Sequence, residues 1–312
     1  MSTPPPDSHE SAHPDHTASE IREILRRVRK IELRTRGLVR ESFGGEYHSC
    51  FKGEGIDFED FREYQPGDEV RSIDWNVTAR MGHPFVKKFT EEREMTVFVC
   101  VDISASGNYG SHGPSKRELM AEVAALLTFS ALQNKDKVGL ILFTDGVELY
   151  LPPKKGTAHA LRIIREILLF EPTGHKTALG DTIHLLKNAV RKRSLVFLLS
   201  DFLFEEDLAT DLRIVSQKHD VVSIQVSDPA ELELPAAGSV RLEDPETEAQ
   251  VEINTSSPRV RQAYAAEAAR WQEEIDQQFK RLSIDKISLR TDEEYLPALH
   301  AFFKKRERTE IA

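Results

Sequence analysis

The sequence predicts an α/β protein with a mostly parallel central sheet flanked by helices, preceded by a small N-terminal subdomain. From Thr96 onward, continuous apolar runs of strand length alternate with amphipathic helical patterns. Each crossover between parallel strands lays a helix on the sheet, and strands that are covered on both faces are apolar throughout. The alternation therefore indicates an open sheet with helices on both sides.

The strands and helices can be placed in chain order. Residues 147–151 follow the preceding strand after only Asp145 and Gly146, so we expect an antiparallel hairpin at one edge of the sheet. The expected strands are residues 96–103, 137–144, 147–151, 194–200, 220–226 and 286–290. The expected helices are residues 116–133, 159–169, 179–191, 207–219, 258–282 and 293–306.

The chain before the sheet domain begins with a polar tail. Residues 1–19 hold prolines, histidines and small polar residues with almost nothing to bury, so we expect disorder. Thr17 and Glu20 have capping-box spacing, and the helical period that follows predicts a helix to about Arg36. Its basic face is typical of a solvated surface and also suits an acidic partner. That face carries Arg22, Arg26, Arg27, Arg29, Lys30, Arg34 and Arg36.

These patterns divide the chain into three expected parts. Residues 1–19 are the tail, and residues 20–94 are the first helix with the small subdomain. Residues 95–306 are the sheet domain, with a probable hairpin insertion at about residues 229–257.

Composition and charge exclude several classes of function. The 312 residues carry a formal net charge of −10 with a pI near 5.6, which argues against a nucleic-acid partner. The apolar runs are far shorter than the roughly 20 residues of a membrane helix, and the N-terminus does not resemble a signal peptide. We therefore expect no membrane insertion and a cytoplasmic location. The two cysteines, Cys50 and Cys100, argue against a disulfide framework and a cysteine metal site.

The candidate site begins in the stretch VCVDISASG. Asp102, Ser104 and Ser106 follow an apolar run at every second position, so they would converge on one side if the strand stayed extended. A second apolar strand ends at Asp201, and Thr177 lies just before a helix. Ligands of open parallel sheets bind outside the carboxyl ends of the strands. Hydroxyls and carboxylates without imidazole or thiolate favour a hard cation, Mg²⁺ or Mn²⁺.

Two other interpretations of these residues stay open. Serines after a strand are also typical turn caps, and the two aspartates can accept hydrogen bonds from loop amides. A cation is nevertheless the simplest way to keep two facing carboxylates ionised. A haloacid-dehalogenase-like phosphatase would use Asp102 with Mg²⁺, but Ser104 stands where that chemistry needs an acid–base carboxylate. The G-x-x-x-x-G-K-[ST] stretch of P-loop ATPases is absent from the sequence.

The same five residues resemble a known metal site. Asp102-Ile-Ser104-Ala-Ser106 with the distant Thr177 and Asp201 is similar to the metal-ion-dependent adhesion site (MIDAS) of von Willebrand factor A domains. All five positions of that pattern are filled. The resemblance implies a Rossmann-type sheet and a Mg²⁺ or Mn²⁺ ion that leaves one position for a partner's acidic side chain. This sequence departs from the MIDAS pattern in one respect: a loop at residues 108–115 separates Ser106 from the expected helix at residues 116–133.

The segment before the sheet domain resembles the signature of the bacterial family called domain of unknown function 58. Five blocks occur in the expected order, and the two resemblances together cover roughly residues 20–306. The family resemblance implies a module that works with a MoxR-type AAA+ ATPase in the assembly, maturation or stress response of other proteins. The blocks are Gly53–Phe58, Phe61–Tyr64, Pro66–Arg71, Ile73–Trp75 and Ala79–Arg80.

This signature segment is expected to organise the small subdomain, with a recognition surface for the ATPase as the alternative. The run Gln-Pro-Gly-Asp is typical of a turn, and arginines beside aspartates suit bidentate pairs that would lock the segment to the sheet domain. The expected buried anchors are Phe58, Phe61, Tyr64 and Trp75, and the expected pairs join Arg62, Arg71 and Arg80 to Asp68 and Asp74.

The sequence as a whole predicts a metal-dependent protein-binding or adaptor module, with no catalytic constellation identified. Its expected partner is a MoxR-type AAA+ ATPase, a client protein or both, bound through an acidic side chain at the metal. The phosphatase that would use Asp102 is the alternative.

Overall fold

The computed structural model describes residues 18–51, 57–90, 94–174, 176–203, 209–243 and 249–311. Of the expected tail, residues 1–17 lie outside the described residues, and the last two belong to the first helix. The chain divides into two compact units, one made of residues 1–50 with 96–312 and the other of residues 51–95.

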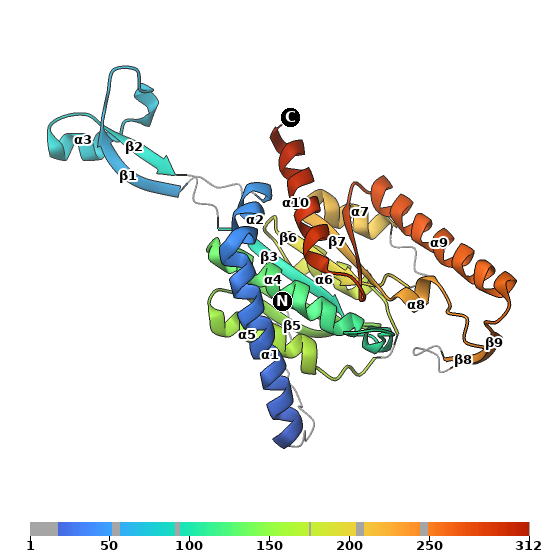
Figure 1. Cartoon of the computed structure of the whole chain (residues 1–312). Helices are drawn as coiled ribbons and strands as arrows, with labels where there is room; N and C mark the ends of the chain where they lie inside the picture. The colour runs from blue at the N-terminus through green and yellow to red at the C-terminus, as the bar shows by residue number, and fades with distance from the viewer. Residues whose placement is uncertain are drawn as a thin grey trace, which may run out of the picture. The chain divides into compact units, whose positions relative to one another are not determined.

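The larger unit is built on a central sheet, seen in Figure 1. Among the described residues the sheet has six strands in the order β10-β7-β6-β3-β4-β5. All neighbours are parallel except β4 and β5, which confirms the predicted fold class and the antiparallel edge hairpin. The strands are β3 (Thr96–Asp102), β4 (Lys137–Phe143), β5 (Val147–Lys154), β6 (Leu195–Ser200), β7 (Asp220–Ser227) and β10 (Asp285–Arg290).

Helices cover both faces of this sheet (Figure 1). On one face, α6, α7 and α9 share an apolar cluster with Phe98 and Cys100 of β3. On the other face, α4 packs on β3 and β4, α5 on β4, and α10 on β10. These helices are α4 (Lys116–Gln133), α5 (Thr157–Leu169), α6 (Gly180–Ala189), α7 (Ala209–Lys218), α9 (Pro258–Arg281) and α10 (Tyr295–Ile311).

The first helix, α1 (Ala18–Leu38), belongs to the larger unit, although the sequence grouped it with the small subdomain. It packs on α4 and α5, and Arg27 and Arg34 form ion pairs with Glu118 and Glu122 of α4 at 2.7 and 3.1 Å. Part of the basic face is therefore used inside the chain. A π-helical turn (Val39–Phe43) and α2 (Gly44–Cys50) continue the segment, and α2 packs on α10.

The segment between β7 and α9 holds a short helix and a hairpin. The helix is α8 (Pro229–Leu232), and Asp228 caps it by accepting a hydrogen bond from Ala230 N. The hairpin pairs β8 (Ser239–Glu243) with β9 (Gln250–Asn254) in antiparallel register. Both elements lie inside the stretch where the sequence suggested an insertion.

The small unit contains an antiparallel pair and short helical turns. Strand β1 (Asp57–Glu63) pairs with β2 (Phe85–Thr90), and a 3₁₀ turn (Val70–Ser72) precedes α3 (Trp75–Met81). The predicted turn is present, because Asp68 N donates to Gln65 O at 3.0 Å. Arg62 forms the predicted bidentate pair with Asp68, with both hydrogen bonds at 2.7 Å, but both residues belong to the small unit, so this pair does not lock the segment to the sheet domain. Asp74 instead caps α3 by accepting from two backbone amides.

The prediction that Trp75 is a buried anchor is wrong, because its side chain is 65% exposed. A two-stranded sheet with one seven-residue helix encloses too little volume to bury every aromatic residue of the segment. Val70 and Met81, which flank Trp75 in the sequence, are also exposed. The signature segment therefore presents apolar side chains to its surroundings.

We expect Trp75→Ala to change the free energy of unfolding by less than about 0.5 kcal/mol, as is usual for exposed positions. Val86→Ala is the control for a buried position in the same unit, since Val86 is 2% exposed, and it is expected to cost more. Denaturant unfolding of the whole chain checks both variants. A loss of several kcal/mol in Trp75→Ala would restore the anchor interpretation.

No helix in the described parts of the chain combines the length and the apolar character needed to cross a membrane. Cys50 and Cys100 are buried, and neither forms a disulfide among the described residues.

Candidate metal centre

The candidate site lies at the carboxyl edge of the sheet, where the strand order reverses. The chain runs from β3 outward to β4 and β5, and then returns to β6 on the other side of β3. Such a switch point opens a crevice between two loops that leave in opposite directions. Asp102 is the last residue of β3, and Asp201 directly follows β6.

The loop after β3 brings its serines together by turning, not by remaining extended. The strand ends at Asp102, whose Oδ1 accepts a hydrogen bond from Ser104 N at 2.9 Å, and residues 105–108 form a 3₁₀ turn. We expected an extended strand to place Asp102, Ser104 and Ser106 on one side, and this is wrong because the chain turns after Asp102. The expected convergence still holds for the serines, since their Oγ atoms lie 3.1 Å apart.

Hydroxyl groups join the two aspartates into one buried network. Ser106 Oγ donates to Asp201 Oδ2 at 2.8 Å, and Ser200 Oγ donates to Asp102 Oδ2 at 2.6 Å. Asp201 Oδ1 also accepts from Leu203 N at 3.1 Å. The aspartates thus bind loop amides, as the turn-cap interpretation expected, and still converge from two strands.

Thr177 lies in the loop before α6. Ala178 N donates to Thr144 O at 2.8 Å, and Thr144 is the residue that follows β4. Because β4 is the neighbour of β3, this bond ties the Thr177 loop to the same edge of the sheet. The Thr177 side chain is buried.

Asp102 is poorly solvated and faces a second carboxylate. It is 2% exposed, and this burial, followed by the charge of Asp201, raises the pKa of Asp102 to about 7. The hydrogen bonds from Ser200 and Ser104 act in the opposite direction but are outweighed. At neutral pH the carboxyl group of Asp102 is therefore close to its titration point.

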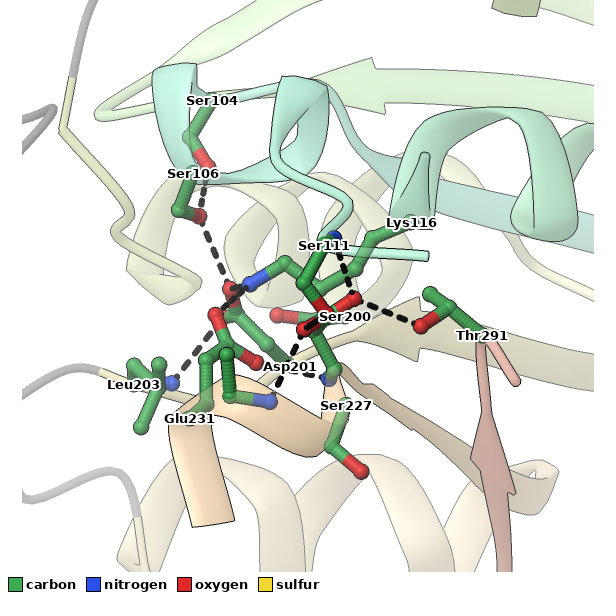
Figure 2. A network of polar contacts seen from close by, with 12 residues as sticks. Ser104, Ser106, Ser111, Lys116, Ser200, Asp201, Leu203, Ser227, Glu231 and Thr291 are labelled. Carbon is green, nitrogen blue, oxygen red and sulfur yellow. Dashed lines mark hydrogen bonds and ion pairs between the residues drawn. The ribbon is translucent and has the colours of Figure 1, made fainter. Parts of the chain in front are cut away.

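Sequence reasoning missed a lysine at the centre of this site. Lys116, the first residue of α4, is 1% exposed, and its Nζ donates to Asp201 Oδ2 at 2.6 Å and to Glu231 Oε1 at 2.5 Å. Figure 2 shows its ammonium group between the two carboxylates. Burial alone would lower the pKa of Lys116, but Asp201 and Glu231 outweigh it and raise the pKa above its ordinary value.

A second carboxylate network fixes the loop at residues 108–115 at the rim of the site (Figure 2). Asp228, which follows β7, accepts hydrogen bonds from Ser111 N at 2.9 Å and from Thr291 Oγ1 at 2.7 Å. The loop is thereby joined to the ends of β7 and β10. His112, in the same loop, is exposed.

The carboxylate and hydroxyl oxygens of this site suit a hard cation, but the ammonium group of Lys116 competes with it. Two carboxylates and several hydroxyls are the oxygen ligands that Mg²⁺ and Mn²⁺ prefer. In the described residues, no group of three or more His, Cys, Asp or Glu side chains could hold a metal ion. Asp201 Oδ2 already accepts from both Ser106 and Lys116. A cation at Asp201 would therefore compete with the ammonium group of Lys116.

The fold and this edge define an open-sheet α/β protein with a hydroxyl and carboxylate crevice at its switch point. The chain belongs to the family described as "Protein of unknown function DUF58", whose model matches residues 60–274.

The curated relatives described here carry the description "Uncharacterized protein". One from Mycobacterium bovis is 30% identical over 287 residues, which covers 91% of this chain and 90% of the relative. An uncharacterized protein of Mycobacterium tuberculosis matches with the same values. Uncharacterized protein YeaD of Bacillus subtilis is 26% identical over 108 residues, or 35% of this chain and 25% of that protein.

Among solved structures, the conserved hypothetical protein BatB from Bacteroides thetaiotaomicron is similar at 17% identity, with a TM-score of 0.45 over 70% of this chain and 100% of that one. The VWA domain of SpRpn10 is similar at 11% identity, with a TM-score of 0.37 over 65% of this chain and 92% of that one.

Proposed function

We propose that this protein is a metal-dependent protein-binding module. Its Mg²⁺ or Mn²⁺ would be held, directly or through water, by Asp102, Ser104, Ser106, Thr177 and Asp201. The observation that carries the proposal is the convergence of two buried carboxylates, linked through serine hydroxyls, at the switch point of the sheet. A divalent cation there would supply an electrophilic position that a carboxylate of a partner can complete.

Lys116 gives this site a positive charge of its own. Two carboxylates that face each other in a buried crevice repel, and the ammonium group partly offsets that repulsion. When Lys116 leaves Asp201, it still has Glu231 as an ion-pair partner. The buried ammonium group therefore keeps a partner when Asp201 turns from Lys116 to a metal ion.

The proposed partner is a MoxR-type AAA+ ATPase, a client protein or both. Five side chains can fill at most five of the six positions that Mg²⁺ requires, so at least one position is left to water or to a partner's acidic side chain. The choice of a MoxR-type ATPase is supported by the family resemblance described above.

Binding of a purified MoxR-type ATPase from the same organism should require a divalent metal, and we expect it to be lost in Thr177→Ala. Removal of this neutral hydroxyl changes the coordination but not the charge of the site, so long-range electrostatics cannot explain a loss. Biolayer interferometry with Mg²⁺ and with a chelator provides the measurement. Thr173→Ala is the matched control, because Thr173 lies in the same loop and binds Glu148.

Two results would contradict this proposal. Binding that persists in chelator places the contact outside the metal site. Equal losses in Thr177→Ala and Thr173→Ala point to the loop itself and not to the coordinating hydroxyl. In either case the exposed Val70, Trp75 and Met81 would be the next surface to test.

The phosphatase alternative can be tested with the same proteins. The position two residues after Asp102 is Ser104, whose Oγ contacts Ser106 Oγ, so the group that chemistry needs for proton transfer is a hydroxyl. We expect no hydrolysis of a phosphate ester with Mg²⁺ above that of Asp102→Ala. Turnover that depends on Asp102 would favour the phosphatase.

A further inference from the structure

A cavity of about 260 Å³ opens beside Asp201. Its walls come from the end of β7, from α8 and from one face of α9. We call it the α9 pocket and define it by Asp201, Gln225, Glu231, Tyr264, Glu267 and Trp271. The proposed function does not use this cavity.

Two buried polar atoms of the pocket walls lack a hydrogen-bond partner among the described residues. Gln225 is 2% exposed, and its Nε2 donates to Asp201 O at 3.2 Å, but its Oε1 accepts nothing. The indole Nε1 of Trp271 donates to nothing. Buried polar groups without partners are costly, so natural proteins rarely keep them. Neither atom is open to the cavity in this conformation, so a ligand that brings both a donor and an acceptor would satisfy the pair once the two side chains turn toward it.

The charged side chains around the pocket determine whether it favours a positively or a negatively charged ligand. Asp201, Glu231 and Glu267 line the pocket, and no Lys, Arg or His side chain is among the described residues that line it. Lys116 pairs with Asp201 and Glu231, and Arg270 of α9 pairs with Glu267, so two of these three carboxylates are offset. The remaining charge is negative and favours a cation.

The aromatic side chains of Tyr264 and Trp271 in the pocket wall favour one kind of cation over another. Tyr264 is held by its hydroxyl, which donates to Ala230 O at 3.3 Å, and Trp271 packs against the apolar cluster of the sheet. Aromatic faces attract cations, and guanidinium groups more than ammonium groups because they are planar and weakly hydrated. A guanidinium also carries five N–H donors, any of which suits Gln225 Oε1.

We propose that the α9 pocket binds the side chain of an arginine carried by a peptide segment of a partner. The guanidinium provides donors for Gln225 Oε1 and positive charge for Glu231 and Glu267. A peptide carbonyl next to it provides the acceptor that Trp271 Nε1 lacks. This site shares Asp201 with the proposed metal centre, but the ligand is held by Gln225, Glu231, Glu267 and Trp271, so it binds whether or not a divalent cation is present.

The protein carries its own reporter for this binding. Its two tryptophans are Trp75 and Trp271, so in a Trp75→Phe background the only indole fluorescence comes from the pocket wall. This background protein is titrated with N-acetyl-arginine amide in the presence of a chelator. The matched control ligand is N-acetyl-citrulline amide, which has nearly the same shape but no charge. We expect a saturable change in emission with the arginine ligand and at least about tenfold weaker binding of citrulline.

Variants on α9 locate the binding site. Glu267→Gln removes an exposed pocket carboxylate and is expected to weaken arginine binding about two- to fivefold, as for a surface ion pair. Glu273→Gln, on the same helix but outside the pocket, is the matched control and should have no effect. Gln225→Leu removes the unpaired acceptor and is expected to cost about tenfold or more, with its thermal unfolding measured alongside.

Equal responses to arginine and citrulline, or no saturable response to arginine, would overturn the proposal and leave the pocket as a water-filled cavity. A loss in Glu273→Gln equal to that in Glu267→Gln would overturn the location. Because the chelator is present throughout, these outcomes do not depend on whether the metal site binds a cation.

Discussion

Lys116→Met is expected to lower the free energy of unfolding of the metal-free protein by about 3–5 kcal/mol, the range found when one partner of a buried ion pair is removed. The ammonium group of Lys116 is 1% exposed and contacts both Asp201 and Glu231. Methionine keeps the apolar stem but leaves these carboxylates, and Asp102 beside them, without a cation. Denaturant unfolding in a chelator measures the loss.

The same variant is expected to regain stability in Mg²⁺ to a greater extent than the wild type. A ligand that binds only the folded state stabilises it in proportion to the logarithm of its concentration over its dissociation constant. Since Lys116 competes with a cation for Asp201 Oδ2, its removal should lower that constant. The experiment compares the unfolding midpoints of both proteins in chelator and in excess Mg²⁺.

Lys187→Met is the matched control, because Lys187 forms a surface pair with Asp211 at 3.8 Å. It should change stability by no more than about 1 kcal/mol and show the Mg²⁺ response of the wild type. If Lys116→Met is as stable as the wild type in chelator, the carboxylates around it do not need its charge. If Mg²⁺ stabilises Lys116→Met no more than the wild type, the proposed competition is wrong.

The sheet could be predicted because its signals are local. The strands are continuous apolar runs, and the helices between them have clear periods and caps. Helix α4 begins at the predicted Lys116 because Ser115 and Glu118 form a capping box there. The edge strand β5 runs on to Lys154, past its predicted end and through two prolines. Its pairing with β4 shifts register at the prolines, between Leu140 and Val138, and an irregular edge strand tolerates residues that have no N–H to donate.

Only some of the residues that meet at the candidate metal site could be predicted from the sequence. Asp102 and Asp201 were found because each ends an apolar strand. Lys116 was not, because a lysine at the first position of a helix is usually solvated. Its burial depends on Asp201 and Glu231, which lie 85 and 115 residues further along the chain. Glu231 sits on the four-residue helix α8, which has no periodic pattern of its own.

Asp102→Asn and Asp201→Asn are each expected to weaken Mg²⁺ or Mn²⁺ binding by at least about 10- to 100-fold, the loss known for residues that merely orient metal ligands. Both substitutions keep the shape of the side chain and remove one carboxylate from the crevice. Isothermal titration calorimetry with the purified proteins measures the affinity. An unchanged metal titration in either variant would refute the site.

Asp228→Asn is the matched control for the general loss of negative charge at this edge of the sheet. Asp228 is also buried and follows the neighbouring strand β7, but its hydrogen bonds go to Ser111, Thr291 and α8. We expect Asp228→Asn to bind metal nearly as tightly as the wild type. An equal loss in all three variants would mean that the summed charge of the edge attracts the cation and that Asp102 and Asp201 are not specific ligands.

The affinity of the wild type for Mg²⁺ should also fall as the pH is lowered through about 7. Burial and the charge of Asp201 raise the pKa of Asp102 to about 7, so below that pH a proton occupies the carboxyl group that the metal needs. One competing proton lowers the apparent affinity about tenfold for each pH unit below the pKa, whereas an ordinary aspartate would give no change above pH 5. A Mg²⁺ affinity that is constant between pH 5.5 and 8 would contradict the raised pKa of Asp102 in the metal-free site.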